Sequence, residues 1–215
     1  MITSSVQNLF QSSRLRYIGV ENCKGFTKFI TDILNDPEDH ALSTTALIRP
    51  QGPQDVKEYL ENINKSLIAV AICLNQGNSK PSVPTIDAST QNGQEPEETP
   101  VIIGYIMINY GGVPPAYQHR RTGTIGLSIA SGFQNKGYGR EAINWITDWG
   151  FRHAGLHTVR IETYSFNERA AYLYQDMGFV LDGRKRDIVP FDRKWYDALL
   201  FSMTEDEWEA LRKGK

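Results

Sequence analysis

The chain has 215 residues, enough for one domain with a sizeable buried core, and 40% of them are hydrophobic, as in an ordinary soluble protein. Lys and Arg total 23 and Asp and Glu total 25, so the formal net charge is −2 and no basic excess indicates a nucleic-acid partner. Cys23 and Cys73 fit no metal-ligand or disulfide pattern, which favours a reducing compartment. We therefore expect a cytoplasmic protein, with the nucleus open as a second location.

Residues 1–13 are polar and lack the apolar core of a signal peptide, so we expect a flexible N-terminal tail before a single domain at residues 14–215. No apolar run approaches the length that crosses a bilayer, so no membrane association is expected. The first predicted elements are a strand at Leu15–Val20, a helix through Phe26–Leu34 that ends at Pro37, a helix from Pro53 through Ile63, and buried strands at Leu67–Leu74 and Val101–Tyr110. Residues 75–100, rich in Gly, Pro, Ser, Thr, Asn and Glu, predict a mobile insertion, and residues 111–121 predict a second loop.

A glycine-containing loop separates the next strand from the next helix. Ile125–Ile129 alternates apolar and small residues as a strand does, and Ala142, Ile146 and Trp149 recur at helical spacing. In the loop Gln134–Gly139, glycines allow a ligand to approach the backbone closely, and the helix N-terminus that follows favours an anion. The junction therefore predicts a phosphate-binding loop.

A second strand and helix follow about thirty residues later. Thr158–Tyr164 alternates as a strand, Asn167 is a natural N-cap, and Gly178 is a natural terminator for a helix of about ten residues. The tail from Thr204 predicts a short closing helix, since Thr204 and Glu207 have the spacing of a capping box.

These motifs resemble those of the GNAT superfamily of acyl-CoA N-acyltransferases. The family's loop Arg/Gln-x-x-Gly-x-Gly/Ala and its signature Asn-x-x-Ala-x-x-x-Tyr-x-x-x-Gly-Phe are matched by Gln134, Gly137, Gly139, Asn167, Ala170, Tyr174, Gly178 and Phe179. The stretch from Lys136 to His157 resembles the branch of ribosomal-protein N-terminal and polyamine acetyltransferases. The resemblance implies an α/β (α+β) fold with a mixed, strongly twisted sheet, flanked by helices and splayed at the acyl-CoA site.

The resemblance also implies where the cosubstrate acetyl-CoA binds. Its pantetheine arm would pair with the backbone of Ile129, Ala130 and Ser131. Its pyrophosphate would lie on the loop residues Gln134, Asn135, Lys136, Gly137, Tyr138, Gly139 and Arg140, and Asn167 and Tyr174 would reach the arm. No metal is implied.

Tyr174 is the expected general acid, because a phenol with a pKa near 10 is matched to protonate a departing thiolate. The general base is left open, because Thr124 stands where many family members have a strand glutamate. Glu162 could take the proton through water, and Asp197 or Glu141 could bind a cationic amine.

We therefore expect an acetyl-CoA-dependent N-acetyltransferase that acts by direct attack of a primary amine, on a small molecule or a protein N-terminus. A catalytically weak acyl-CoA-binding sensor is the alternative, suggested by Thr124. A nucleotide-binding protein of the doubly wound type fits the loop but not the second motif. Two copies could pair through the carboxyl-terminal strand and the tail that carries Trp208.

Overall fold

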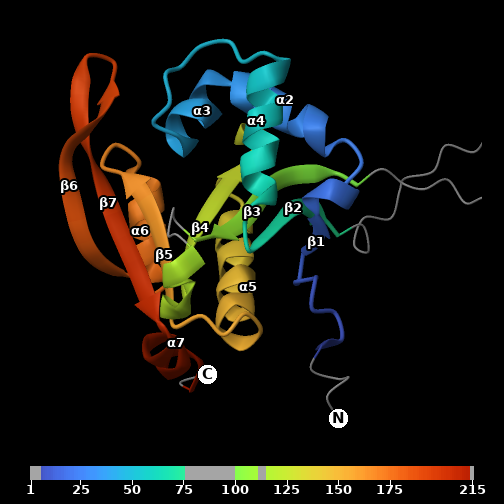
Figure 1. Cartoon of the computed structure of the whole chain (residues 1–215), viewed down its shortest axis with the longest axis vertical. Coiled ribbons are helices and arrows are strands. Elements are labelled where there is room, and N and C mark those ends of the chain that lie inside the picture. The colour runs from blue at the N-terminus through green and yellow to red at the C-terminus, as the bar shows by residue number, and fades with distance from the viewer. Residues whose placement is uncertain (1–5, 76–99, 111–114, 214–215) are drawn as a thin grey trace, which may run out of the picture.

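The computed structural model describes residues 6–75, 100–110 and 115–213 (Figure 1). Within these residues, the strands are β1 (Leu15–Gly19), β2 (Ile68–Leu74), β3 (Ile102–Asn109), β4 (Thr122–Ile129), β5 (Thr158–Tyr164), β6 (Val180–Phe191) and β7 (Lys194–Thr204). They form one sheet in the order β1-β2-β3-β4-β5-β7-β6. The helices are α2 (Phe26–Asn35), α3 (Pro37–Ser43), α4 (Pro53–Asn64), α5 (Tyr138–Arg152), α6 (Glu168–Asp176) and α7 (Glu205–Lys213).

The sheet splays between β4 and β5, as predicted. These two strands are parallel, and their pairing is limited to Thr122–Ile125 of β4 against Thr158–Ile161 of β5. Beyond that point β4 continues against β3 up to Ile129, while β5 continues against β7 up to Tyr164. All the other strand pairs of the described residues are antiparallel, which excludes the doubly wound alternative.

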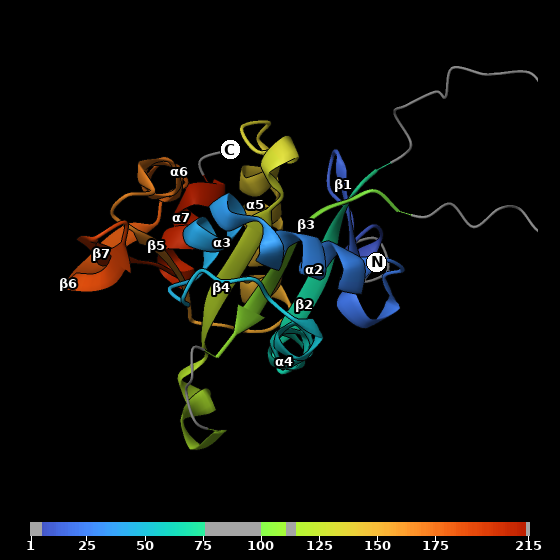
Figure 2. The same cartoon turned by 90° about the horizontal axis from the view of Figure 1, so that it is seen from above.

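Helices cover both faces of the sheet (Figures 1 and 2). On β2, Val70 and Ile72 belong to a core cluster that includes residues of α5, while Ala71 and Cys73 belong to a second cluster with α2 and α4. Successive strand residues point to opposite faces, so the near-continuous apolar run of β2 is explained by burial on both sides.

The sequence prediction missed α3. The helix α2 ends at Asn35, before Pro37, but Asp36 then accepts hydrogen bonds from the N–H groups of Glu38 and Asp39 and caps a new helix. Pro37 occupies the first turn of α3, where its missing N–H costs nothing, so this proline starts a helix as well as following one.

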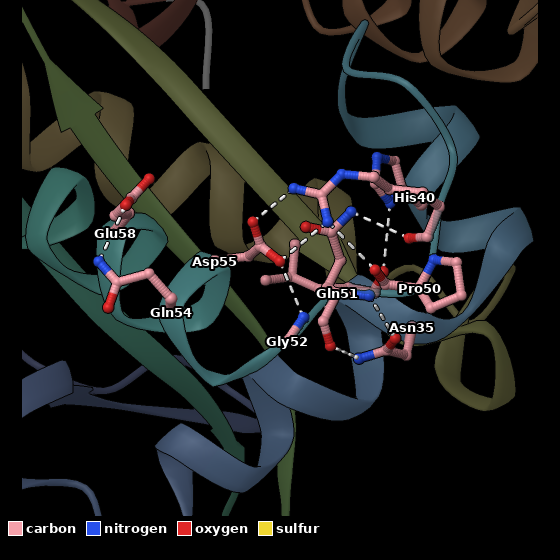
Figure 3. A network of polar contacts seen from close by, with 10 residues as sticks. Asn35, His40, Pro50, Gln51, Gly52, Gln54, Asp55 and Glu58 are labelled. Carbon is pink, nitrogen blue, oxygen red and sulfur yellow. Dashed lines mark hydrogen bonds and ion pairs between the residues drawn. The ribbon is translucent and has the colours of Figure 1, made fainter.

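A polar network holds the segment between α3 and α4 (Figure 3). The Asn35 carboxamide exchanges hydrogen bonds with both backbone groups of Gln51, and Arg49 forms an ion pair with Asp55. Asp55 also accepts from the N–H of Gly52 at 2.8 Å and completes the start of α4. These contacts fix the connection that keeps α3 beside the sheet.

The ends of the chain differ from their predictions. Part of the expected N-terminal tail contacts α5, since Trp145 Nε1 donates to the Leu9 carbonyl at 2.7 Å. Trp208, expected on a surface that pairs two copies, is buried in its own chain, where it donates to Asp148 and packs against Phe151. The predicted capping box is present, with Glu207 accepting from Thr204. The insertion expected at 75–100 lies almost entirely outside the described residues.

Candidate functional site

A pocket of about 570 Å³ opens where β4 and β5 part. It is lined by β4 from Thr124 to Ile129, by the loop before α5, by β5 from Ile161 to Tyr164, and by residues of α3 and α6. The predicted site residues that line it are Ile129, Gln134, Asn135, Gly137, Tyr138, Gly139, Arg140, Glu162, Asn167 and Tyr174. Ala130, Ser131 and Lys136 are not part of the lining.

The loop before α5 presents unpaired N–H groups to this pocket. Asn135 and Gly137 both have positive φ, 61° and 79°, which turns the chain sharply into the helix. Gly137 is the N-cap of α5 and supplies no side-chain cap, so the first N–H groups of the helix have no partner within the helix. Together with the helix dipole, this arrangement fits a phosphate group.

Gln134 holds the loop in place through its side chain. Its Nε2 donates to the Ile129 carbonyl at 2.8 Å and to Asp39 at 3.0 Å, and its Oε1 accepts from Arg169 at 2.6 Å. Arg169 also donates to the Asn135 side chain. This glutamine is thus a structural link between β4, α3 and α6, a role that the loop motif alone does not show.

The backbone of β4 directs some of its polar groups into the gap. The Ala130 N–H bonds to the Ile103 carbonyl on β3, and backbone groups alternate sides along an antiparallel strand. Leu127 and Ile129 therefore direct their N–H groups away from β3, toward the side where β5 has separated. Because the Ser131 N–H is bonded to Asp39 at 3.3 Å, Leu127 and Ile129 are better placed than Ala130 and Ser131 to bind an extended ligand.

Tyr174 belongs both to the core and to the pocket. Its ring packs edge-on against Phe201, with centroids 5.7 Å apart, and against Phe179, and the residue is 8% exposed. Burial raises the pKa of the Tyr174 hydroxyl well above its ordinary value, so the group stays protonated at physiological pH. A protonated phenol at the edge of a pocket can donate a proton to a leaving group.

Of the three carboxylates considered for the base or the amine, only Glu162 lines the pocket. Asp197 accepts from Arg184 and from the Asp187 N–H. Burial raises the pKa of Glu141, but hydrogen bonds from Arg14 and Ser12 outweigh it and hold the pKa below its ordinary value. Neither Asp197 nor Glu141 is therefore available in the pocket.

The cations of the loop already have partners within the chain. Lys136 Nζ donates to the Gly132 carbonyl at 2.8 Å, and Arg140 forms a 2.6 Å ion pair with Asp176. Both side chains are exposed in part, and only Arg140 lines the pocket.

An aromatic cluster lies beyond the β5 end of the pocket. Phe166 packs against Tyr164, Phe191 and Tyr196, with ring centroids 5.1 to 5.5 Å apart, and Tyr164 itself lines the pocket. Trp195, the second residue of β7, lies outside this cluster and is 61% exposed.

Asp39 is a charged pocket residue that the sequence analysis did not predict. It comes from α3 and is 4% exposed, and its carboxylate accepts from the Ser131 N–H and from Gln134 Nε2. Burial raises the pKa of Asp39, and the nearby charge of Asp36 adds to this effect. The only available signal was Asp36-Pro37, which can cap and start a helix.

Asp39 makes a pH-dependent contribution to stability. Because its pKa is higher in the folded than in the unfolded chain, ionisation opposes folding, and the contribution is favourable at low pH and lost as pH rises through the folded pKa. We expect the free energy of unfolding of the wild type to decrease, relative to that of Asp39→Asn, as the pH rises from 4 to 7. Urea denaturation across this range measures it, with Asp32→Asn on the exposed face of α2 as the control. A difference that does not change with pH would contradict the prediction.

Neither a bilayer-crossing helix nor a cluster of His, Cys, Asp and Glu suited to a metal ion is found in residues 6–75, 100–110 and 115–213.

Known proteins that resemble this chain include acetyltransferases, as the two motifs in the pocket predict. The model of the acetyltransferase (GNAT) family matches residues 88–179, a segment that contains both motifs. This part of the chain is therefore similar to the GNAT family. The chain is similar to the SPbeta prophage-derived uncharacterized N-acetyltransferase YokL of Bacillus subtilis, with 30% identity over 92 residues, 42% of this chain and 52% of the relative.

Other relatives of this chain carry more specific names. The [ribosomal protein uS5]-alanine N-acetyltransferase of Escherichia coli is 27% identical over 84 residues, 39% of this chain and 43% of the relative. The matches thus span about half the length of these curated relatives. A solved spermidine N-acetyltransferase from Vibrio cholerae, in complex with CoA and spermine, shares the fold with a TM-score of 0.69 at 16% identity, covering 92% of this chain and 99% of the other.

Proposed function

We propose that this protein is an acetyl-CoA-dependent N-acetyltransferase that acts on a primary amine. The observation that carries the proposal is a single pocket which contains a phosphate-binding loop at one end and a buried, protonated tyrosine in its wall. Relatives and fold neighbours named as N-acetyltransferases support it, and one of those neighbours was solved with CoA.

The residues of the pocket fit an extended thioester ligand. The N–H groups at the start of α5, from Tyr138 to Arg140, would bind the pyrophosphate, and Leu127 and Ile129 would pair with the pantetheine arm. The thioester would supply the acyl group and a thiolate leaving group.

Two side chains would handle the protons. Tyr174 would donate its proton to the departing sulfur, and the exposed Glu162 carboxylate would accept a proton from the attacking ammonium through water. The N–H of Leu127, directed into the same gap, would stabilise the oxyanion of the tetrahedral intermediate, while the Leu127 carbonyl and the Ile129 N–H pair with the pantetheine arm.

The acceptor is proposed as a primary amine on a small molecule or at a protein N-terminus. The names of the relatives include both kinds of acceptor, a ribosomal-protein alanine and spermidine.

We propose that the reaction takes place in the cytoplasm, consistent with the two buried free thiols. We also propose that two copies pair through the exposed edge strand β6.

Two measurements test the function. Calorimetric titration with acetyl-CoA is expected to show binding in the low-micromolar range. Thiol release from acetyl-CoA is then followed with a panel that contains spermidine and peptides with a free N-terminal alanine, and at least one amine is expected to accelerate release. The absence of binding at millimolar acetyl-CoA would overturn the proposal. Binding of acetyl-CoA without acceleration by any amine would favour the acyl-CoA-binding sensor. That alternative is suggested by Thr124, which lines the pocket where a carboxylate base was expected.

A further inference from the structure

Arg14 reaches the phosphate-binding loop from the other end of the chain. Residues before β1 form a tight hairpin, in which the Ser12 N–H donates to the Leu15 carbonyl at 2.8 Å and the Tyr17 N–H to the Phe10 carbonyl at 2.9 Å. This hairpin lies against α5, where Tyr17 stacks on Trp145 with ring centroids 3.7 Å apart. Arg14 is thereby brought beside the start of α5.

Glu141 fixes the orientation of Arg14. One carboxylate oxygen accepts from the Arg14 N–H and from Ser12 Oγ, both at 2.7 Å, and the other accepts from Arg14 Nε at 2.7 Å. The Glu141 side chain is only 14% exposed. Arg14 Nη1 donates to the Lys136 carbonyl at 2.8 Å, and its guanidinium lies 4.6 Å from the centroid of the Tyr138 ring. An arginine held at three points in this way loses little further freedom when it binds a ligand.

The remaining guanidinium nitrogen, Nη2, is directed at the loop. It lies 3.3 Å from the position that a Cβ on Gly137 would occupy, and among the described residues no hydrogen bond from it is recorded. The Arg14 side chain is 45% exposed, so a ligand can reach this nitrogen. Arg14 is not part of the pocket lining, so it would meet a part of the ligand that extends beyond the pocket.

We propose that Arg14 binds the 3′-phosphate of coenzyme A. This inference rests on the proposed function. The thioester end of the cosubstrate would lie at Tyr174 and the pyrophosphate on the N–H groups of α5. The nucleotide, which carries the 3′-phosphate at the opposite end from the sulfur, would then leave the pocket across the loop, where Arg14 Nη2 lies.

Charge and hydrogen bonding favour Arg14 for this role over the other cations of the loop. Arg140 is paired with Asp176, and Arg169 donates to Gln134 and Asn135. Glu141 balances the charge of Arg14, so Arg14 contributes a directed, charge-assisted hydrogen bond rather than a general field. Loss of such a bond is expected to weaken binding about 10- to 100-fold.

The test compares coenzyme A with 3′-dephospho-coenzyme A, which differs only in lacking this phosphate. We expect calorimetry to show that the wild type binds coenzyme A about 10- to 100-fold more tightly than the dephospho form. In Arg14→Gln this preference is expected to be lost, through weaker binding of coenzyme A and nearly unchanged binding of the dephospho form. Arg16→Gln, which removes an exposed arginine from β1, is expected to keep the preference.

The outcomes separate this inference from the proposed function. Equal affinity of the wild type for both ligands overturns the assignment of Arg14 without any variant, and leaves the proposed function standing. An equal loss for both ligands in Arg14→Gln also overturns it, because it would place Arg14 at the pyrophosphate or in a purely structural role. If Arg14→Gln does not fold, Arg14→Lys replaces it, with the preference expected to fall partway because one donor geometry is lost. Failure of the wild type to bind either ligand would overturn the proposed function itself.

Discussion

Gly137→Val is expected to weaken binding of coenzyme A by at least 100-fold. Gly137 has φ of 79°, a conformation that a β-branched residue rarely adopts, and a side chain there would meet Arg14 and the surface offered to the pyrophosphate. The variant must therefore either strain the loop or displace it, and the N–H groups of α5 would no longer converge on one phosphate. Calorimetric titration with acetyl-CoA measures the change.

The matched control lies in the turn that follows the opposite end of the same helix. Gly155 also has positive φ, 63°, but a Cβ there meets nothing within 4 Å, and the residue is not part of the pocket lining. We expect Gly155→Val to lose about 1–3 kcal/mol of stability from backbone strain and to keep the wild-type affinity. If Gly137→Val is folded and binds acetyl-CoA as the wild type does, the loop is not the pyrophosphate site.

Tyr174→Phe is expected to lower kcat about 100- to 10,000-fold, the range in which general acids contribute. The phenylalanine keeps the ring that packs against Phe201 and Phe179, so the fold and the affinity for acetyl-CoA should change little. Steady-state rates of thiol release, with an amine that the wild type accepts, measure the loss.

Tyr172→Phe provides the comparison for this variant. Tyr172 lies on the same helix and also lines the pocket, but it is 69% exposed, and we expect its substitution to change kcat less than threefold. An undiminished kcat in Tyr174→Phe would leave Tyr174 with a packing role alone.

The pH dependence gives an independent check on Tyr174. Since burial raises the pKa of its hydroxyl, the acid form persists on the alkaline side of the ordinary tyrosine range. The wild-type rate should therefore not decline with a pKa near 10. An alkaline decline there that Tyr174→Phe removes would contradict the raised pKa of the Tyr174 hydroxyl, although it would still support Tyr174 as the acid.

The sequence alone predicted the parts of this protein that depend on neighbouring residues in the chain. Three predicted elements form where their capping and turn residues lie: the loop from Gln134 to Gly139, the helix capped by Asn167, and the closing helix capped by Thr204. Such signals are local, because a cap or a left-handed glycine acts within one turn. The same signals carried the resemblance to the GNAT family, and with it the splayed sheet.

Only the tertiary structure decided which distant side chains join the site. Asp39 meets Ser131 and Gln134 across more than ninety residues, and Arg14 meets Glu141 across 127. No periodicity records such contacts, since they depend on how α3 and the N-terminal hairpin pack against the sheet and α5. The same packing paired Glu141 with Arg14 and Asp197 with Arg184, both outside the pocket lining, and left Glu162 in the pocket. A carboxylate binds the cation or N–H donor that folding brings beside it.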